Sequence, residues 1–236
     1  MTVTSNVLQY PGAFRRTSTG ENPLMRLDHI VFAAGPEGLA GTASKLSELL
    51  GEEFVTGGVH PRFGTRNAIL PLAEGTYLEI VEVLDHPASD KAPFGQAVRA
   101  RSLLGGGWLG WAVSVDDIAP FESRLGRESV NGNRHRPDGV ELLWKQLGVK
   151  GLQSDPQLPF FVQWEIDPGL HPSAGASGEV SLQALEIAGD PARVSEWLGQ
   201  PVEPPLEGVK VEWVAPNGTP GIVAAQFQTR NGVVRL

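Results

Sequence analysis

The chain contains no cysteine, which excludes disulfide bonds, thiolate nucleophiles and cysteine-ligated metals. Any metal would have to be held by His, Glu, Asp, Gln or water. The sequence also lacks an apolar run of the roughly 18 residues that a membrane span needs. Residues 1–24 lack the apolar segment of a secretory signal and are expected to form a loose arm. A cytoplasmic protein is therefore the expectation.

Positive charge is scarce: 19 Lys and Arg stand against 27 Asp and Glu, giving a net charge of −8. An acidic chain has no general attraction to phosphate, so neither nucleic acid nor a membrane surface is an expected partner. The sequence has no phosphate-binding glycine loop and no dinucleotide fingerprint, so no nucleotide cofactor is expected. The 29 glycines and 19 prolines favour many turns and short strands over a helix bundle.

A weak repeat organises the chain. Three segments share an apolar strand, a turn, a short amphipathic helix and a closing Leu-Gly, and they end at Gly51, Gly126 and Gly199. Strand patterns follow each segment. The repeat predicts an α+β fold with an arm at 1–24, βαβββ modules at 25–104 and 105–179, and a third, partial module at 180–236. Module one is expected to pair with module two, because consecutive elements usually neighbour in space; pairing with module three is the alternative.

Two polar residues interrupt apolar strands in the first module. His29 lies in LDHIVFAA and Glu79 in TYLEIVEV. Taken singly, His29 fits a hydrogen-bonded core histidine and Glu79 a carboxylate paired with an arginine. An ionised carboxylate on an apolar face is costly unless it is paired or binds a metal. Together, on the first and last strands of one βαβββ unit, they are candidate metal ligands.

This arrangement resembles the vicinal oxygen chelate superfamily, which includes glyoxalase I, extradiol dioxygenases, methylmalonyl-CoA epimerase and bleomycin-resistance proteins. The segment HPRFGTRNAILPL, residues 60–72, and parts of 136–165 are similar to the bacterial glyoxalase-like domain family. The resemblance covers about residues 25–166. It implies tandem βαβββ modules forming a cupped half-barrel. It also implies a divalent metal held by a His from the first strand and a Glu or Gln from the last strand of each module.

The second module departs from that metal pattern. Aligning LGWAVSV with LDHIVFA places Trp111 where His29 stands, and Gln163 falls where Glu79 stands. The indole N–H of a tryptophan only donates, so Trp111 cannot be a ligand. The resemblance therefore implies a reduced metal site of His29, Glu79 and Gln163, open to Zn, Mn, Ni or Fe. With only two ligands, the metal would be held weakly.

Further residues have a functional and a structural interpretation. His60 fits a replacement ligand, a general base or a surface histidine. Arg66 and Asn67 are candidates to bind a substrate carboxylate or carbonyl, or to satisfy their own turn. Trp111 and Trp144 form either an aromatic wall of the cup or part of a tryptophan-rich core. The basic run 134–136 precedes a turn and fits a solvated loop or a contact to an anionic substrate.

Two functional hypotheses follow, both with a small molecule as partner. The first is a glyoxalase-like enzyme carrying out metal-assisted isomerase or lyase chemistry on a substrate with vicinal oxygens, in which Glu79 or His60 moves a proton. The second is a metal-free binding protein that sequesters an aromatic ligand or drug. A scaffold role is a third hypothesis without a positive feature. A homodimer is compatible with the resemblance. The reaction type cannot be read from a shared scaffold.

Overall fold

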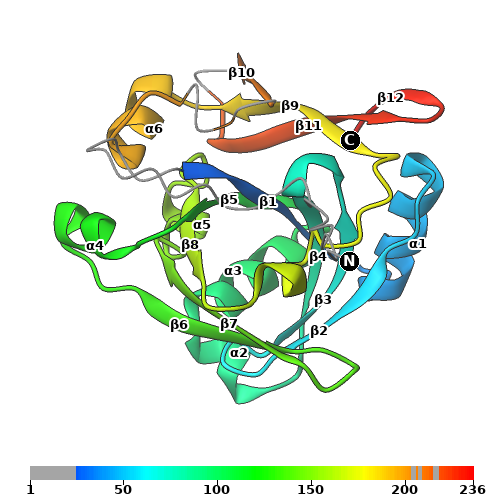
Figure 1. Ribbon diagram of the computed structural model, residues 1–236, viewed down its shortest axis with the longest axis horizontal. Coiled ribbons are helices and arrows are strands. Elements are labelled where there is room, and N and C mark those ends of the chain that lie inside the picture. The colour runs from blue at the N-terminus through cyan, green and yellow to red at the C-terminus, as the bar shows by residue number, and fades with distance from the viewer. Residues whose placement is uncertain (1–24, 203–205, 207–208, 215–217) are drawn as a thin grey trace, which may run out of the picture.

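The computed structural model describes residues 25–202, 206, 209–214 and 218–236, so the arm expected at 1–24 lies outside the described part. The described chain has the predicted α+β fold of tandem βαβββ modules with a further module at the C-terminal end (Figure 1). Across these ranges no helix has the length and apolar character that a membrane crossing requires.

The elements follow one another in the order that the repeat predicts. The first module consists of β1 (Met25–Ala33), α1 (Gly38–Leu50), β2 (Val55–His60), β3 (Thr65–Pro71), η1 (Ala73–Gly75) and β4 (Tyr77–Val83). Two helices then lead to the second module: α2 (Pro87–Lys91) and α3 (Pro93–Leu103). The second module consists of β5 (Gly107–Val115), α4 (Ala119–Leu125), β6 (Val130–His135), β7 (Glu141–Leu147), α5 (Gly151–Ser154), β8 (Phe160–Trp164) and the following η2 (Pro168–Leu170). The third module consists of β9 (Ser181–Ala188), α6 (Pro191–Leu198), β10 (Lys210–Val214), β11 (Gly221–Thr229) and β12 (Gly232–Arg235).

The closing glycines of the repeat are helix C-caps. Gly51, Gly126 and Gly199 follow α1, α4 and α6 with φ of 74°, 60° and 76°. Glycine adopts this left-handed conformation without the steric cost of a Cβ, so the helix can stop and the chain can turn into the next strand. At the other end of α6, the Asp190 side chain accepts a hydrogen bond from the Ala192 N–H, as an N-cap does.

The first two modules close one barrel in the strand order β1-β4-β3-β2-β6-β7-β8-β5. Within each module the first strand is parallel to the last, and β1 and β5 join the modules in antiparallel pairing. The expected pairing of module one with module two is therefore present, and the two half-barrels meet. The two modules also meet between β2 and β6, in a second seam that consists of the single pair Val59 and His135.

Gly58 is expected to be essential for this narrow seam. It has a φ of 139°, and a Cβ there would overlap the carbonyl oxygen of His135 on β6. We expect Gly58→Ala to lower the free energy of unfolding by about 2–4 kcal/mol, because both the backbone conformation and the strand contact must change. Urea denaturation measures the effect. Gly151→Ala, where a Cβ meets nothing within 4 Å, is the control and is expected to change stability by less than about 0.5 kcal/mol. Equal stability of the two variants would contradict the role of the seam.

The third module packs on the outside of the barrel and does not enter it. Its sheet has the order β10-β9-β11-β12, with β9 between a parallel and an antiparallel neighbour. Figure 1 shows this sheet as a layer over β1 and β5. Leu185, Ile187 and Phe227 share a buried cluster with Trp111 from β5. The outer face of the β1–β5 pair is therefore core, and the barrel interior holds a separate cluster to which α3 contributes Phe94.

Candidate functional site

The barrel interior encloses a small cavity with a volume of about 30 Å³. Its wall combines aromatic rings with a few polar and charged groups. The lining residues are His29, His60, Phe63, Asn67, Tyr77, Glu79, Phe94, Arg134, Trp144, Gln146, Phe160, Val162 and Trp164. Strand alternation explains most of this set, because every second residue of a strand faces the same side. An apolar pocket with a few convergent polar groups is the usual form of a small-molecule site.

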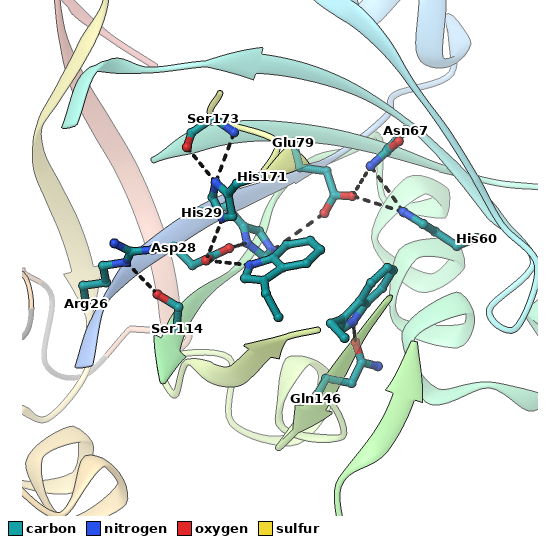
Figure 2. A network of polar contacts seen from close by, with 12 residues as sticks. Arg26, Asp28, His29, His60, Asn67, Glu79, Ser114, Gln146, His171 and Ser173 are labelled. Carbon is teal, nitrogen blue, oxygen red and sulfur yellow. Dashed lines mark hydrogen bonds and ion pairs between the residues drawn. The ribbon is translucent and has the colours of Figure 1, made fainter. Parts of the chain in front are cut away.

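His29 is held by a buried carboxylate. Its Nδ1 donates to Asp28 Oδ1 over 2.6 Å, and its ring stacks on Tyr77 at 4.5 Å between centroids. Asp28 is fully buried, and its Oδ2 accepts hydrogen bonds from Trp164 Nε1 at 2.9 Å and from His171 Nε2 at 3.2 Å. Figure 2 shows this group beside the Glu79 side chain. With Nδ1 occupied, His29 presents Nε2 to the cavity.

Asp28 is ionised in this setting. Burial alone would raise the pKa of its carboxyl, but the charge and hydrogen bonds of His171 and His29 hold that pKa well below its usual range. His171 Nδ1 accepts a hydrogen bond from the Ser173 N–H, so its Nε2 carries the proton that is donated to Asp28. The carboxylate therefore connects the first module to the segment that follows β8.

Glu79 faces His29 across a gap and is positioned by Asn67. Glu79 Oε1 accepts a hydrogen bond from Asn67 Nδ2 over 2.6 Å. Its Oε2 lies 3.9 Å from His29 Nε2, which is too far for a direct hydrogen bond. Neither atom is therefore bonded to the other, and both side chains line the cavity (Figure 2).

His60 is neutral. Burial, followed by the nearby charges of Arg134 and His29, lowers the pKa of His60 to about 3. Its Nδ1 lies 2.9 Å from Thr65 Oγ1 and its Nε2 lies 3.3 Å from Asn67 Nδ2. The amide nitrogen can only donate, so Nε2 accepts and Nδ1 carries the proton. His60 is therefore a hydrogen-bonding group at neutral pH and is not a cation.

Five of the residues predicted from the sequence come together at the cavity: His29, His60, Asn67, Glu79 and Trp144. The Trp144 indole donates to Gln146 Oε1 over 3.0 Å.

Three predicted residues lie elsewhere. Arg66 is about half exposed and forms an ion pair with Glu82 at 2.6 Å, on the outer face of β3. Gln163 Oε1 accepts a hydrogen bond from the Ile118 N–H, and so this side chain is turned toward the start of α4. Trp111 is fully buried in the outer cluster and donates to the carbonyl oxygen of Gln157.

Strand register shows which residues replace the expected ligands. His29 is paired with Ala112 across the β1–β5 junction, and Ala112 belongs to the inner cluster. In the first module His29 is opposite Tyr77, two residues before Glu79; in the second, Ala112 is opposite Phe160, two residues before Val162. The alignment over Trp111 and Gln163 was thus one residue out of register, which reverses the face of each side chain. The second module offers two apolar residues at these positions.

These residues do not fit a resident metal. Apart from the two apolar positions, the Asn67 amide group donates to Glu79 and lies beside His60 Nε2, so N–H dipoles point where a shared cation would sit. In the described part of the chain, no three His, Asp or Glu side chains are arranged to hold a metal ion. His29 and Glu79 remain as a pair facing the cavity.

Sequence reasoning missed Asp28 and His171, which hold His29 through hydrogen bonds from outside the cavity wall. Asp28 adjoins His29, but strand alternation assigns it to the opposite face; the register shift between Leu27 and His29 breaks that rule. The run 134–136 fits a solvated loop or a contact to an anionic substrate, and within it Arg134 lies in β6 with a buried side chain, which excludes the solvated loop for this residue. No sequence pattern indicated a role for His171, because it lies in the irregular segment that follows η2.

Comparisons with known proteins agree with this fold. The family model of the glyoxalase-like domain matches residues 27–202. A hypothetical protein from Staphylococcus aureus is similar in structure, with a TM-score of 0.61 and 16% identity, covering 89% of this chain and 98% of its own. At this identity the likeness shows the fold alone. Methylmalonyl-CoA epimerase from Mycobacterium tuberculosis has a TM-score of 0.42 and 17% identity, covering 65% of this chain and 96% of its own. The curated protein sequences contained no match. Since the family model spans most of the chain, the protein belongs to the glyoxalase-like domain family, and the resemblance predicted over about residues 25–166 is confirmed.

Proposed function

We propose that this protein is a small-molecule enzyme that moves a proton at a carbon next to a carbonyl group, in an isomerase- or lyase-type reaction. The observation that carries the proposal is His29 Nε2 facing Glu79 across 3.9 Å in a cavity, with Nδ1 fixed on a buried carboxylate. An imidazole oriented in this way is a suitable general base. Glu79, positioned by Asn67, is the partner that receives or returns a proton.

The proton balance is simple. His29 Nε2 takes the proton from carbon, and the C–H electron pair moves into the new carbon–carbon double bond while the carbonyl oxygen gains negative charge. Gln146 lines the cavity and its Oε1 accepts a hydrogen bond from the Trp144 indole, so its amide N–H groups are the part of this side chain that can donate to that oxygen. Protonation of the former carbonyl carbon, with transfer of the proton of a neighbouring hydroxyl group to the carbonyl oxygen, completes the isomerisation of a hydroxycarbonyl compound. Loss of a leaving group from the carbon on the other side of the deprotonated carbon would instead give a lyase reaction.

Hydrogen exchange tests this proposal. Enolisable hydroxycarbonyl and dicarbonyl compounds are incubated with the protein in D₂O and followed by proton NMR. We expect protein-dependent loss of the signal at the carbon next to a carbonyl for at least one compound, well above the buffer rate. Absence of exchange across the panel would contradict the proposal.

The donor set leads to a prediction about metals. Because Ala112 and Val162 replace two expected ligands, we expect the exchange rate to change by less than about twofold after dialysis against EDTA, or on adding Zn²⁺, Mn²⁺, Ni²⁺ or Fe²⁺. Elemental analysis of the same samples provides the control for occupancy. Stoichiometric metal whose removal abolishes exchange would contradict this prediction and favour the metal-assisted reaction.

The aromatic wall favours a second candidate function, sequestration of an aromatic ligand. Trp144 and Trp164 lie 5.4 Å apart between ring centroids, and Phe63, Phe94 and Phe160 complete the apolar lining. Binding of an aromatic compound, detected by tryptophan fluorescence, without exchange of any carbonyl compound would favour this candidate.

A further inference from the structure

Arg134 brings a positive charge into the barrel. It lies in β6 opposite Leu142 of β7, lines the cavity and is only 5% exposed. Its neighbours in sequence have conventional surface contacts: His135 contacts Glu141, and Arg136 forms an ion pair with Asp138. Of the two interpretations of the run 134–136, the solvated loop fits His135 and Arg136, whereas the guanidinium of Arg134 faces the cavity.

This guanidinium has no protein partner in the described part of the chain. Its Nε is buried without a hydrogen bond, and none of the ion pairs formed by described residues includes it. Glu79 acts on Arg134 through its charge, yet its Oε1 is held by Asn67. An arginine remains protonated at any physiological pH, and a buried charge without a paired counter-ion costs several kcal/mol. A protein tolerates this cost when a bound ligand supplies the missing counter-ion.

The surrounding groups indicate what that ligand carries. A guanidinium presents a planar fork of N–H donors that matches a carboxylate through two parallel hydrogen bonds. The Gln146 amide, also in the cavity wall, can donate to an adjacent oxygen. The volume of about 30 Å³ admits only a small polar head. Phe63, Phe94 and Gln146 also line a larger groove of about 1010 Å³ outside the cavity, which leaves room for a substituent.

We propose that Arg134 binds the carboxylate of the substrate, and that the substrate is an organic acid with a carbonyl or hydroxyl oxygen on the carbon next to that carboxylate. This inference rests on the proposed function, because it assigns the ligand of the same cavity. It narrows the substrate class to 2-oxo and 2-hydroxy acids and places the negative charge against β6, away from Asp28.

Binding of a non-reacting pair tests the inference. Oxamate carries a carboxylate beside a carbonyl, and oxamide is its neutral counterpart of the same shape. By isothermal titration calorimetry we expect the protein to bind oxamate at least about tenfold more tightly than oxamide, and Arg134→Met to weaken oxamate binding by about 10- to 100-fold. Arg136→Met is the matched control, because Arg136 follows β6 directly and forms an ion pair with Asp138 outside the cavity. This variant is expected to bind oxamate as the unchanged protein does.

Thermal unfolding separates loss of binding from loss of fold. Because it removes an unpaired buried charge, Arg134→Met is expected to unfold at a higher temperature than the unchanged protein without ligand, while oxamate raises the unfolding temperature of the unchanged protein only. Equal affinity for oxamate and oxamide, no binding of either, or unchanged binding by Arg134→Met would overturn the inference. Oxamate needs no proton transfer, so binding through Arg134 without hydrogen exchange would overturn the proposed function alone. Exchange of neutral compounds without oxamate preference would overturn this inference alone.

Discussion

Replacing His29 by glutamine is expected to slow hydrogen exchange at the substrate carbon by about a hundredfold to ten-thousandfold. A positioned base contributes a factor of this size to proton transfer, and a glutamine amide cannot take up the proton. Asp28→Asn is expected to cause a loss of similar order, because the carboxylate that fixes Nδ1–H is replaced by an amide that leaves the tautomer free. The measurement is the NMR exchange rate at saturating substrate.

Two controls make this result specific. His135→Gln alters an exposed histidine outside the cavity and is expected to exchange hydrogen at the unchanged rate. His29→Gln is expected to keep oxamate binding, which shows that its cavity is intact. Circular dichroism checks the fold of Asp28→Asn, since Asp28 is fully buried. A His29→Gln protein that retains exchange within about threefold would rule out His29 as the base.

Acidification is expected to destabilise the protein steeply from about pH 6.5 downward, with His60 as a main cause. The unfolded chain binds a proton on His60 below about pH 6.5, whereas in the folded protein burial, Arg134 and His29 lower its pKa to about 3. Between these values the unfolded state holds one more proton. The free energy of unfolding therefore falls by about 1.4 kcal/mol for each pH unit that is lost. Asp28, whose folded pKa is also lowered, adds a further loss only below about pH 4.

Urea denaturation at several pH values between about 7 and 4.5 measures this slope. His60→Asn is expected to lose about 1.4 kcal/mol per pH unit less than the unchanged protein, whatever its stability at neutral pH. His86→Asn is the control, because His86 caps α2 with its side chain and asparagine caps a helix equally well. If His60→Asn and the unchanged protein have parallel pH profiles, the buried neutral state of His60 is wrong.

The fold could be predicted from the sequence because the repeat consists of local signals for helix ends and strands. The glycines at 51, 126 and 199 mark helix ends through a backbone conformation that only glycine adopts without strain, and apolar strands flank each helix. The order of strands in the third module was not accessible, since β9 could pair with any later strand. The closure of the barrel through Val59 and His135 likewise depends on a single long-range contact.

The candidate site was only half predictable, for two physical reasons. His29, Glu79, His60 and Asn67 belong to one module, where the motif fixes their spacing. The second module was aligned by the motif LGWAVSV against LDHIVFA, and one residue of error moved Trp111 and Gln163 to the wrong face of their strands. For Arg134 the sequence left a solvated loop and a contact to an anionic substrate as alternatives, because a charged residue beside other charged residues usually indicates solvent, and only the tertiary structure shows that this side chain is enclosed.

The contact between His171 and Asp28 makes the barrel dependent on a segment outside its strands. Residues 165–180 connect β8 to the third module, and this connection also holds the carboxylate that orients His29. Changes in the length or sequence of this connector would therefore alter the orientation of the His29 ring while leaving every barrel strand intact. Substitutions in the connector would therefore change activity without repacking a core. The two-module barrel depends on this connector and would not carry the same site if it were transferred to another protein alone.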